Sequence, residues 1–472
     1  MTRWLRGTAC RCSGESLVSR GANRFDLLSP DAGGVRLRDA VDLPQTQSIS
    51  PKQLEPSVFL RGTIAVLLGT LLLRVAGGVA TGTLNFYLKS FGLEGLEVGF
   101  VAAGYYATEL LLAPVFGALT DRVGRKALVV AAPVVGAIAL LLYPLTSSLG
   151  VLFLIRVIEG ISAAAAIPAT LGYLSDLTDG SPHRARLMGA YEIVTLLGIT
   201  GGGIVLAPLL WGALGTSSYP FLAGVYILGG LVFAFLLPNI GVKVQKRRTL
   251  ADYLRALGNR RLVRFLPAWI SATGVIGLWL VHVQNLLSKG KTLEVSSSQA
   301  LLGAFTPAEV SKYLAWFAVA FLGGLYFWAS RGKSERRTTP MLIAGGGLLL
   351  ISVSWWMLNH PNILGAPLVT LPVLGAVNLW FPVLLIGAFM QAGFTPMALA
   401  YLADISEDFP EDRGVVMGLY SIFLAGGNLI GGSLLGGVFV SALRLDGVIL
   451  LTFLFTLMAF FSVLHIRRVS SD

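Results

Sequence analysis

The sequence predicts an all-α polytopic membrane protein with twelve transmembrane helices in two six-helix pseudo-repeats. Three observations lead to this fold class: scarce charge, two long uncharged stretches and an internal duplication. Only 13% of the 472 residues are charged and 54% are hydrophobic, whereas a soluble protein of this length carries about a quarter charged residues. Apolar residues are spread over most of the chain, so the composition excludes both a soluble protein and one with a single anchor.

Charge placement locates the membrane crossings. No Asp, Glu, Lys or Arg occurs in residues 193–242 or 338–403, and each stretch holds two crossings at about 20 residues per helix. The twelve predicted spans are residues 62–86, 98–118, 127–145, 149–174, 188–212, 219–238, 264–287, 312–330, 340–358, 380–404, 414–440 and 447–466. Residues 361–378 are also apolar, but their three prolines favour an irregular outer loop over a thirteenth span.

An internal repeat supports six spans in each half. Pro168, Tyr173 and Asp176 recur 228 positions later as Pro396, Tyr401 and Asp404. After a slip of one residue, a glycine pattern that favours close helix packing also recurs, with Gly198, Gly202 and Gly203 repeated as Gly427, Gly431 and Gly432. Two parallel six-helix repeats are typical of transporters that rock about a central site.

Basic residues set the orientation and the segment boundaries. With the N-terminus inside, 29 of the 36 Lys and Arg residues lie in inner segments, which predicts a cell (inner) membrane protein with both termini cytoplasmic. The net charge of +11 is therefore topological and predicts no nucleic-acid partner. We expect a disordered cytoplasmic tail (1–60), an N-terminal half (61–240), a cytoplasmic linker (241–263) and a C-terminal half (264–468). Both cysteines lie in the tail, where a lone C-x-C is a weak metal signal.

One loop and one helix carry a family resemblance. The loop reads Gly117-Ala-Leu-Thr-Asp121-Arg122-Val-Gly124-Arg125-Lys126, and a later helix contains Arg156-Val-Ile-Glu159-Gly160. They resemble the G-x-L-x-D-R-x-G-R-K loop and the R-x-x-x-G element of the major facilitator superfamily. Residues 176–203 are most similar to its drug-proton antiporter branch of tetracycline and multidrug efflux proteins. One departure is that Gly203 stands where the antiporter element on the fifth helix has proline.

The resemblance implies a gating role for the loop after the second span. Its residues would tie the two halves together in the outward-open state, with Gly124 permitting a tight turn and Asp121 accepting from a helix N-terminus and from Arg125. An ordinary basic loop obeying the positive-inside rule would explain the cations but not the spaced glycines. The predicted gating residues are Gly117, Asp121, Arg122, Gly124, Arg125 and Lys126.

Four charged residues lie deep within predicted spans of the first half: Arg74, Glu109, Arg156 and Glu159. Each must have a partner, a wet cavity or a proton, because an ionisable group at membrane depth costs at least about 2.5 kcal/mol. We predict that Glu109 carries a proton, with Arg74 or Arg156 as its exchangeable partner, and that Glu159 is the second choice. Two alternatives stay open: static pairs, namely Arg156 with Glu159 and Arg74 with Glu109, or direct contact with substrate.

Cargo contacts are harder to predict from the sequence. Polar and aromatic residues at plausible depth are candidates, although helix packing or interface anchoring is the simpler explanation for any one of them. The scarcity of deep polar residues disfavours a sugar and favours a hydrophobic or amphiphilic cargo. The candidates are Asn85, Tyr105, Tyr106, Trp279, Gln284, Asn285 and Gln391, with His282 and Trp316 as further possibilities.

The predicted function is secondary active transport by alternating access, with proton-coupled efflux of small hydrophobic or amphiphilic molecules as the first choice. The alternatives are uptake or facilitated transport of a small metabolite and, behind them, a transport-dead membrane sensor or scaffold. The sequence has no G-x-x-x-x-G-K-[ST] loop and no H-E-x-x-H motif, so we expect no enzyme activity and no cofactor or metal. The expected partners are a small-molecule substrate, the proton and the lipid bilayer, with the chain as a monomer.

Overall fold

The computed structural model describes residues 55–178, 181, 184–240, 258–289, 298–330, 337–364, 368–371, 375–407 and 413–469. The chain divides into two units, Met1–Lys52 and Gln53–Asp472, and all described residues belong to the second. The predicted tail up to residue 54 and residues 241–257 of the predicted linker lie outside the described part.

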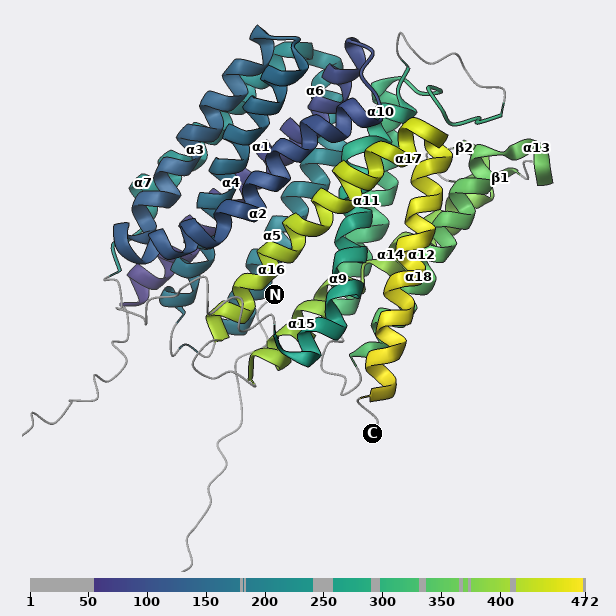
Figure 1. The fold of residues 1–472 in the computed structure, drawn as a ribbon. Coiled ribbons are helices and arrows are strands. Elements are labelled where there is room, and N and C mark those ends of the chain that lie inside the picture. Colours follow the sequence, from purple (N-terminus) through teal and green to yellow (C-terminus); the bar gives the residue numbers. More distant parts are fainter. Residues whose placement is uncertain are drawn as a thin grey trace, which may run out of the picture. The chain divides into compact units, whose positions relative to one another are not determined.

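The first half consists of long apolar helices (Figure 1). Helix α2 packs against α4, α3 packs against α4 and α7, and α1 packs against α7. Short 3₁₀ turns, η1 (Tyr143–Leu145) and η3 (Gly215–Ser217), join neighbouring helices. The helices are α1 (Pro56–Ser90), α2 (Leu96–Val123), α3 (Arg125–Leu142), α4 (Leu149–Leu177), α5 (Arg184–Leu197), η2 (Gly198–Leu206), α6 (Ala207–Leu214) and α7 (Ser218–Leu236).

The second half lies beside the first, coloured green to yellow in Figure 1. Helix α12 packs against α14 and α18, and α9 packs against α16 and α18. Its elements are α9 (Arg260–Leu278), η4 (Trp279–Val283), α10 (Gln284–Leu287), α11 (Pro307–Ser330), α12 (Thr338–Asn359), α13 (Pro361–Leu364), β1 (Leu368–Leu371), β2 (Gly375–Asn378), α14 (Trp380–Gln391), α15 (Phe394–Glu407), α16 (Arg413–Gly427), η5 (Asn428–Leu435), α17 (Gly436–Leu443) and α18 (Leu445–Val469).

The described residues contain twelve membrane crossings. Eleven helical segments are long and apolar enough to span a bilayer, and one of them, Leu187–Leu236, has 50 residues. A straight helix of that length would be about 75 Å long at 1.5 Å per residue, more than twice the apolar thickness of a bilayer. The chain instead turns at Gly215, whose φ is +55°, so this segment crosses twice and the predicted count of twelve is confirmed.

Two segments of π-helix occupy matching positions in the two halves. They are η2 in the fifth crossing and η5 in the eleventh. Gly198, the first residue of η2, is the repeat partner of Gly427, which directly precedes η5. A π-helix leaves carbonyl groups outside the regular α-helical ladder, so both halves have the same local interruption where the repeated glycines lie.

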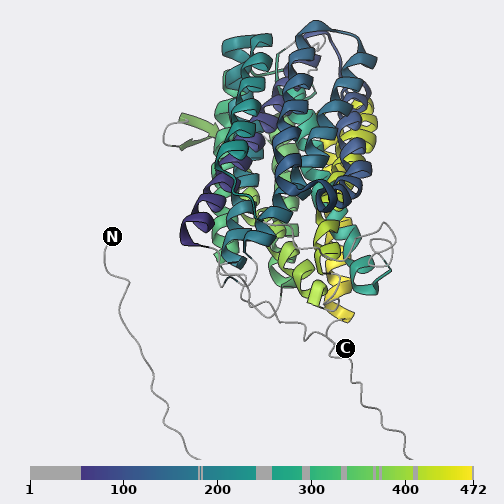
Figure 2. The same cartoon turned by 90° about the vertical axis from the view of Figure 1, so that its left-hand side faces the viewer.

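Residues 361–378 do not form a thirteenth span. The chain forms α13 and then an antiparallel hairpin in which Leu368 pairs with Asn378 and Leu371 with Gly375. The hairpin projects sideways from the helices (Figures 1 and 2). The prediction that this segment does not span the membrane is therefore confirmed. The prediction of an irregular loop is wrong, because the described strands form a regular hairpin.

The helices alternate between two ends of the bundle. One end holds Gly124, Leu237, Asn259 and Val469, and we call it the Gly124 end. The opposite end holds Glu94, Thr146, Gly215 and Arg444, and we call it the Glu94 end.

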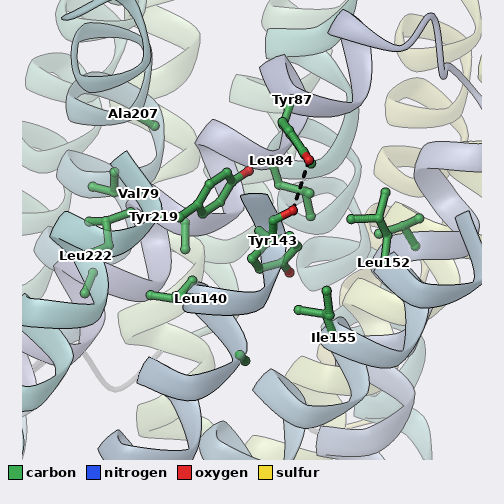
Figure 3. Packing of buried hydrophobic residues seen from close by; sticks show 14 of the residues in the cluster. Val79, Leu84, Tyr87, Leu140, Tyr143, Leu152, Ile155, Ala207, Tyr219 and Leu222 are labelled. Carbon is green, nitrogen blue, oxygen red and sulfur yellow. Dashed lines mark hydrogen bonds between the residues drawn. The ribbon is translucent and has the colours of Figure 1, made fainter. Parts of the chain in front are cut away.

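Near the Glu94 end, the first half has a core of aliphatic and tyrosine side chains (Figure 3). There the Tyr87 hydroxyl donates to the Tyr143 carbonyl at 3.0 Å and to the Thr146 carbonyl at 2.7 Å. These bonds anchor α1 to the turn after α3.

Candidate functional site

A buried ion pair lies on α4, at the contact with α2. Arg156 and Glu159 are each 1% exposed, and Arg156 Nη1 lies 2.7 Å from Glu159 Oε2. A spacing of three residues places both side chains on one helix face. The Tyr143 hydroxyl donates to the same carboxylate oxygen at 2.9 Å, and the Arg156 guanidinium lies 4.4 Å from the centre of the Tyr105 ring.

Glycines bring α2 and α4 close enough for these contacts. A Cβ on Gly104 would lie 2.7 Å from the Phe153 carbonyl oxygen, and one on Gly160 would lie 2.6 Å from the Tyr105 carbonyl oxygen. Either methyl group would push the helices apart. The glycine in the Arg156-Val-Ile-Glu159-Gly160 element therefore seats α2 against α4, which sets the stacking of Tyr105 on Arg156.

Glu109 occupies a different position from Glu159. It lies on α2, one helical turn beyond Tyr105, and is 5% exposed. Within the described part of the chain its carboxylate makes no hydrogen bond and no ion pair, yet it interacts electrostatically with both Arg74 and Arg156. The structure thus brings the four deep charges of the first half within electrostatic reach of one another, with Glu159 directly paired and Glu109 interacting with two cations without a direct bond.

Arg74 links this charge cluster to α5. Its guanidinium interacts electrostatically with the hydroxyl of Tyr191. A Cβ on Gly198 would lie 2.5 Å from Arg74 Cβ, so the start of η2 and α1 are in close contact here. Sequence reasoning missed Tyr143 and Tyr191 as members of the cluster. Tyr191 had one usable signal, since it belongs to the duplicated pattern and recurs as Tyr420, whereas nothing in the sequence singled out Tyr143.

The loop after α2 makes its described contacts within the first half. Gly124 has a φ of +95°. Arg125 pairs with Asp176 at the end of α4 at 3.0 Å, and Lys126 donates to the Leu237 carbonyl at 2.7 Å. The Thr120 hydroxyl donates to the Gly117 carbonyl at 2.6 Å. The side chains of Asp121 and Arg122 lie outside the described residues, so the predicted contacts of Asp121 are not described.

Room for the Arg125 side chain comes from a glycine on α4. A Cβ on Gly172 would lie 2.4 Å from Arg125 Nη1. The guanidinium therefore lies against the α4 backbone and pairs with Asp176, a member of the duplicated pattern that was not among the predicted gating residues. This pair joins the start of α3 to the end of α4 at the Gly124 end.

A second group of polar contacts joins the two halves near the Glu94 end. The Asn85 amide donates to the Leu280 carbonyl at 2.9 Å, the Gln284 amide to the Gly203 carbonyl at 2.5 Å, and the Asn285 amide to the Asn85 carbonyl at 3.1 Å. We call these three bonds the Asn85 contacts. The structure thus places three predicted cargo residues in contacts between the halves rather than in a cavity.

The same end has an ionic contact between the halves. Glu94 pairs with Lys89 of its own half and with Arg444 of the other half. Arg444 has a φ of +57° and is the one non-glycine residue with positive φ among those described. Nearby, the Leu96 amide donates to the Ser441 hydroxyl at 2.8 Å. The Glu94 end is therefore closed by hydrogen bonds and ion pairs that cross from half to half.

Helix packing around the repeated glycines is tight in both halves. A Cβ on Gly202 would lie 2.8 Å from the Val75 carbonyl of α1, and one on Gly431 would lie 2.3 Å from the Gly274 carbonyl of α9. Gly203 lies against Gly78, Gly427 against Thr273, and Gly432 against Gly277. Each π-helical crossing thus contacts the first crossing of its own half almost backbone to backbone.

A cavity of about 110 Å³ lies between α5 with η2 of the first half and several crossings of the second half. Trp279 and Gln391 are the two predicted cargo residues that line it. Tyr105 and Tyr106 belong instead to the charge cluster and to the core of the first half. The polar or aromatic lining residues are Thr195, Thr200, Trp269, Thr273, Trp279, Phe317, Phe321, Gln391, Phe394, Thr395 and Asn428.

Sequence comparison assigns the family. The profile described as Major Facilitator Superfamily matches residues 66–383, well over half of the chain. The chain belongs to the Major Facilitator Superfamily. It is therefore a multi-pass membrane transporter. The resemblance of the loop at 117–126 to this superfamily agrees with that assignment.

Two curated relatives within the superfamily are efflux proteins. The chain is 24% identical over 366 residues to the quinolone resistance protein NorA of Staphylococcus aureus, covering 75% of this chain and 84% of that one. It is 21% identical over 375 residues to multidrug resistance protein 2 of Bacillus subtilis, covering 78% and 86%. These relatives agree with the predicted similarity to the drug-proton antiporter branch.

Solved superfamily structures share the fold. The nucleoside transporter NupG aligns with a TM-score of 0.63 at 13% identity, over 87% of this chain and 99% of that one. A bacterial homologue of the human lysosomal transporter Spinster, solved in an inward-facing and unoccupied conformation, aligns with a TM-score of 0.62 at 14% identity, over 88% and 98%. At this identity the likeness concerns the fold alone.

Proposed function

We propose that this superfamily member exports small hydrophobic or amphiphilic molecules in exchange for protons. The observation behind the proposal is Glu109, a buried carboxylate that has no direct partner among the described residues and interacts electrostatically with both Arg74 and Arg156. A carboxylate with a hydrogen bond to each arginine would be a static structural element. One that only interacts at longer range can gain or lose a proton without breaking a bond.

The proposed coupling acts through Arg74. While Glu109 is ionised, its charge attracts Arg74, which also interacts with the Tyr191 hydroxyl on α5. Protonation removes that attraction and leaves Arg74 with Tyr191 alone. Tyr191 lies one helical turn before Thr195, and Thr195 lines the cavity between the halves. A proton on Glu109 would thus change the forces that hold α1 and α5 beside the cargo cavity.

The asymmetry of contacts between halves supports alternating access. The Asn85 contacts and the pair of Glu94 with Arg444 lie at the Glu94 end. Basic residues are concentrated at the opposite end and in its connecting segments, so we propose that the Gly124 end and both termini are cytoplasmic. The structure would then correspond to a state closed to the outside, and export would require these contacts to break.

We further propose that the chain resides in the cell membrane and acts as a monomer.

Proton movement in proteoliposomes tests the coupling. Purified protein is reconstituted with a trapped pH-sensitive dye, a pH gradient is imposed, and a panel of lipophilic and polar compounds is added one at a time. We expect some lipophilic compounds to trigger proton flux in the unchanged protein. Glu109→Gln should abolish that flux, while the matched variant Glu97→Gln, an exposed residue on the same helix, should retain it.

The same assay separates the proposal from its alternatives. If Glu109→Gln retains full cargo-driven proton flux, Glu109 is not the proton carrier. If Glu159→Gln loses stability yet retains flux, Glu159 is a structural partner of Arg156. If the protein moves one polar metabolite down its gradient and exports no lipophilic compound, the efflux proposal is wrong. Uptake or facilitated transport of a metabolite would then be the function.

A further inference from the structure

We propose that the cavity between the halves binds an uncharged, planar heteroaromatic molecule whose edge has a hydrogen-bond donor next to an acceptor, and that Gln391 and Asn428 are its polar anchors. The proposal rests on the transport function proposed above and names the class of cargo. It arises from three features of the cavity as the described residues form it: two carboxamides without hydrogen-bond partners, aromatic walls and a lining without charged side chains.

Two side-chain carboxamides that line the cavity have no hydrogen bond to any described residue. Gln391, the last residue of α14, is 2% exposed, and Asn428, the first residue of η5, is 7% exposed. Gln391 Oε1 and Asn428 Oδ1 are buried with no hydrogen-bond partner, and within the described part of the chain neither amide group donates to another residue. Nearly all buried polar side-chain atoms in proteins have a partner. Two such amides in one cavity indicate that the partner is a molecule entering from outside.

Asn428 is held in its position by the fold. A Cβ on Gly277 of α9 would lie 2.6 Å from Asn428 Cα and 2.8 Å from its Oδ1. The amide therefore rests directly on the α9 backbone and cannot turn into that helix to find a partner there. The repeat partner of Asn428 is Ile199, so the polar anchor occurs only in the second half and does not follow from the duplication.

The walls beside these amides are aromatic. Trp279 meets Phe317 edge to face with ring centres 5.6 Å apart, and Trp269, Phe321 and Phe394 complete this part of the lining. Flat apolar rings pack well against such surfaces, in stacked or edge-to-face geometry. A carboxamide presents an acceptor and a donor side by side. The complementary group is a ring edge with the same two functions in reverse order, such as a lactam.

The cavity offers no counter-charge. None of its described lining residues is Asp, Glu, Lys, Arg or His, and the deep charges of the first half belong to the separate cluster of Arg156 and Glu159. An unpaired charge at membrane depth is costly, so the cargo would enter this cavity uncharged. At about 110 Å³ the cavity is smaller than the roughly 300 to 1,000 Å³ of pockets for drug-sized ligands. A larger cargo would have to part α5 from the second half.

Equilibrium binding of two matched compounds tests the inference without requiring transport. The full-length protein in lipid nanodiscs is titrated with 2-quinolinone, an uncharged flat lactam, and with 1-methyl-2-quinolinone, in which a methyl group replaces the N–H donor. We expect 2-quinolinone to bind about 2- to 10-fold more tightly, the equivalent of one net hydrogen bond. Gln391→Met and Asn428→Leu should each reduce that preference, and Asn239→Leu, an exposed control at the Gly124 end, should not.

Each outcome decides the inference. Equal affinity of the two compounds in the unchanged protein, no binding of either up to its solubility limit, or an unaltered preference in both cavity variants would overturn it. The comparison of the two compounds uses only the unchanged protein, so it remains valid even if a variant fails to fold. The expected preference without cargo-driven proton flux would contradict the proposed efflux function and leave the cargo class standing.

Discussion

The guanidinium of Arg156 lies 4.4 Å from the centre of the Tyr105 ring while its Nη1 lies 2.7 Å from Glu159 Oε2. One cation thus joins α2 to a carboxylate on its own helix, within a site that is almost completely buried. Glu159 also accepts from Tyr143, so the turn after α3 belongs to the same unit. The consequence is that Glu159 has two direct partners and Glu109 has none among the described residues, which separates a structural carboxylate from a candidate proton carrier.

Replacing Glu159 by Gln should destabilise the protein strongly. The substitution leaves the Arg156 charge buried without its counter-ion, and breaking one side of a buried pair costs about 3 to 5 kcal/mol. Thermal unfolding in detergent micelles measures the effect, with Glu97→Gln as the exposed control. The double variant Arg156→Met/Glu159→Gln should recover part of the loss, and an unchanged midpoint in Glu159→Gln would contradict the pair.

Replacing Tyr191 by Phe should impair coupling more than stability. The variant loses the hydroxyl that interacts with Arg74 but retains the ring. We expect a shift in the pH dependence of cargo-driven proton flux, because Glu109 then interacts with an arginine that has lost its contact with α5. The unfolding midpoint should fall less than in Glu159→Gln, because no charged group loses its counter-ion. An unchanged pH profile would exclude a positioning role for Tyr191.

Replacing Gly431 by Ala should loosen the contact between η5 and α9. The added methyl group would lie 2.3 Å from the Gly274 carbonyl oxygen, and overpacking of this kind costs about 1 to 3 kcal/mol. Gly201→Ala is a matched control in the other π-helix, because a Cβ there meets nothing within 4 Å. Equal unfolding midpoints for the two variants would refute the proposed close packing.

Replacing Gly124 by Ala should strain the turn between α2 and α3. With φ at +95° and ψ at +137°, this turn adopts a conformation that costs a residue with a side chain about 1 to 3 kcal/mol. We expect a lower unfolding midpoint and slower transport. Gly150→Ala is the control, since it lies in the first turn of α4 and a Cβ there has open space. Equal behaviour of the two variants would count against a special role for this turn.

Replacing Glu94 by Gln should favour opening of the Glu94 end. The variant loses the ionic contacts with Lys89 and Arg444, and therefore destabilises the closed state relative to the open one. Spin labels on exposed Phe91 and Leu443 report the distance between halves by double electron-electron resonance. A larger long-distance population is expected. Distance distributions identical to those of Glu97→Gln would show that Glu94 does not hold this end closed.

The number of crossings and the duplication follow from the sequence because the bilayer constrains the chain so strongly. Each crossing must be a continuous apolar helix of about 20 residues, so hydropathy and charge placement are enough to locate it. The helices themselves run further than the predicted spans. The first was predicted for residues 62–86 and extends over Pro56–Ser90, because backbone hydrogen bonding continues past the point where polar residues end the hydropathy signal.

Some contacts of the candidate site could be predicted from the sequence and others could not. Pairing of Arg156 with Glu159 could be predicted because both lie on one helix at a spacing of three. The isolation of Glu109, the interaction of Arg74 with Tyr191 and the use of Asn85, Gln284 and Asn285 between the halves could not. Those contacts join residues from different helices, and their distances depend on how closely glycines let the backbones approach.

By itself the sequence determined the membrane class, the twelve crossings, the duplication and the superfamily, because each depends on local composition and spacing along the chain. Only the tertiary structure decided which polar residues face one another. Gln391 shows the difference: the sequence could mark it only as polar and at plausible depth. Its amide shares a cavity with Asn428 and has no hydrogen-bond partner among the described residues. That arrangement results from the packing of α14 and η5, which the spacing of residues along the sequence does not predict.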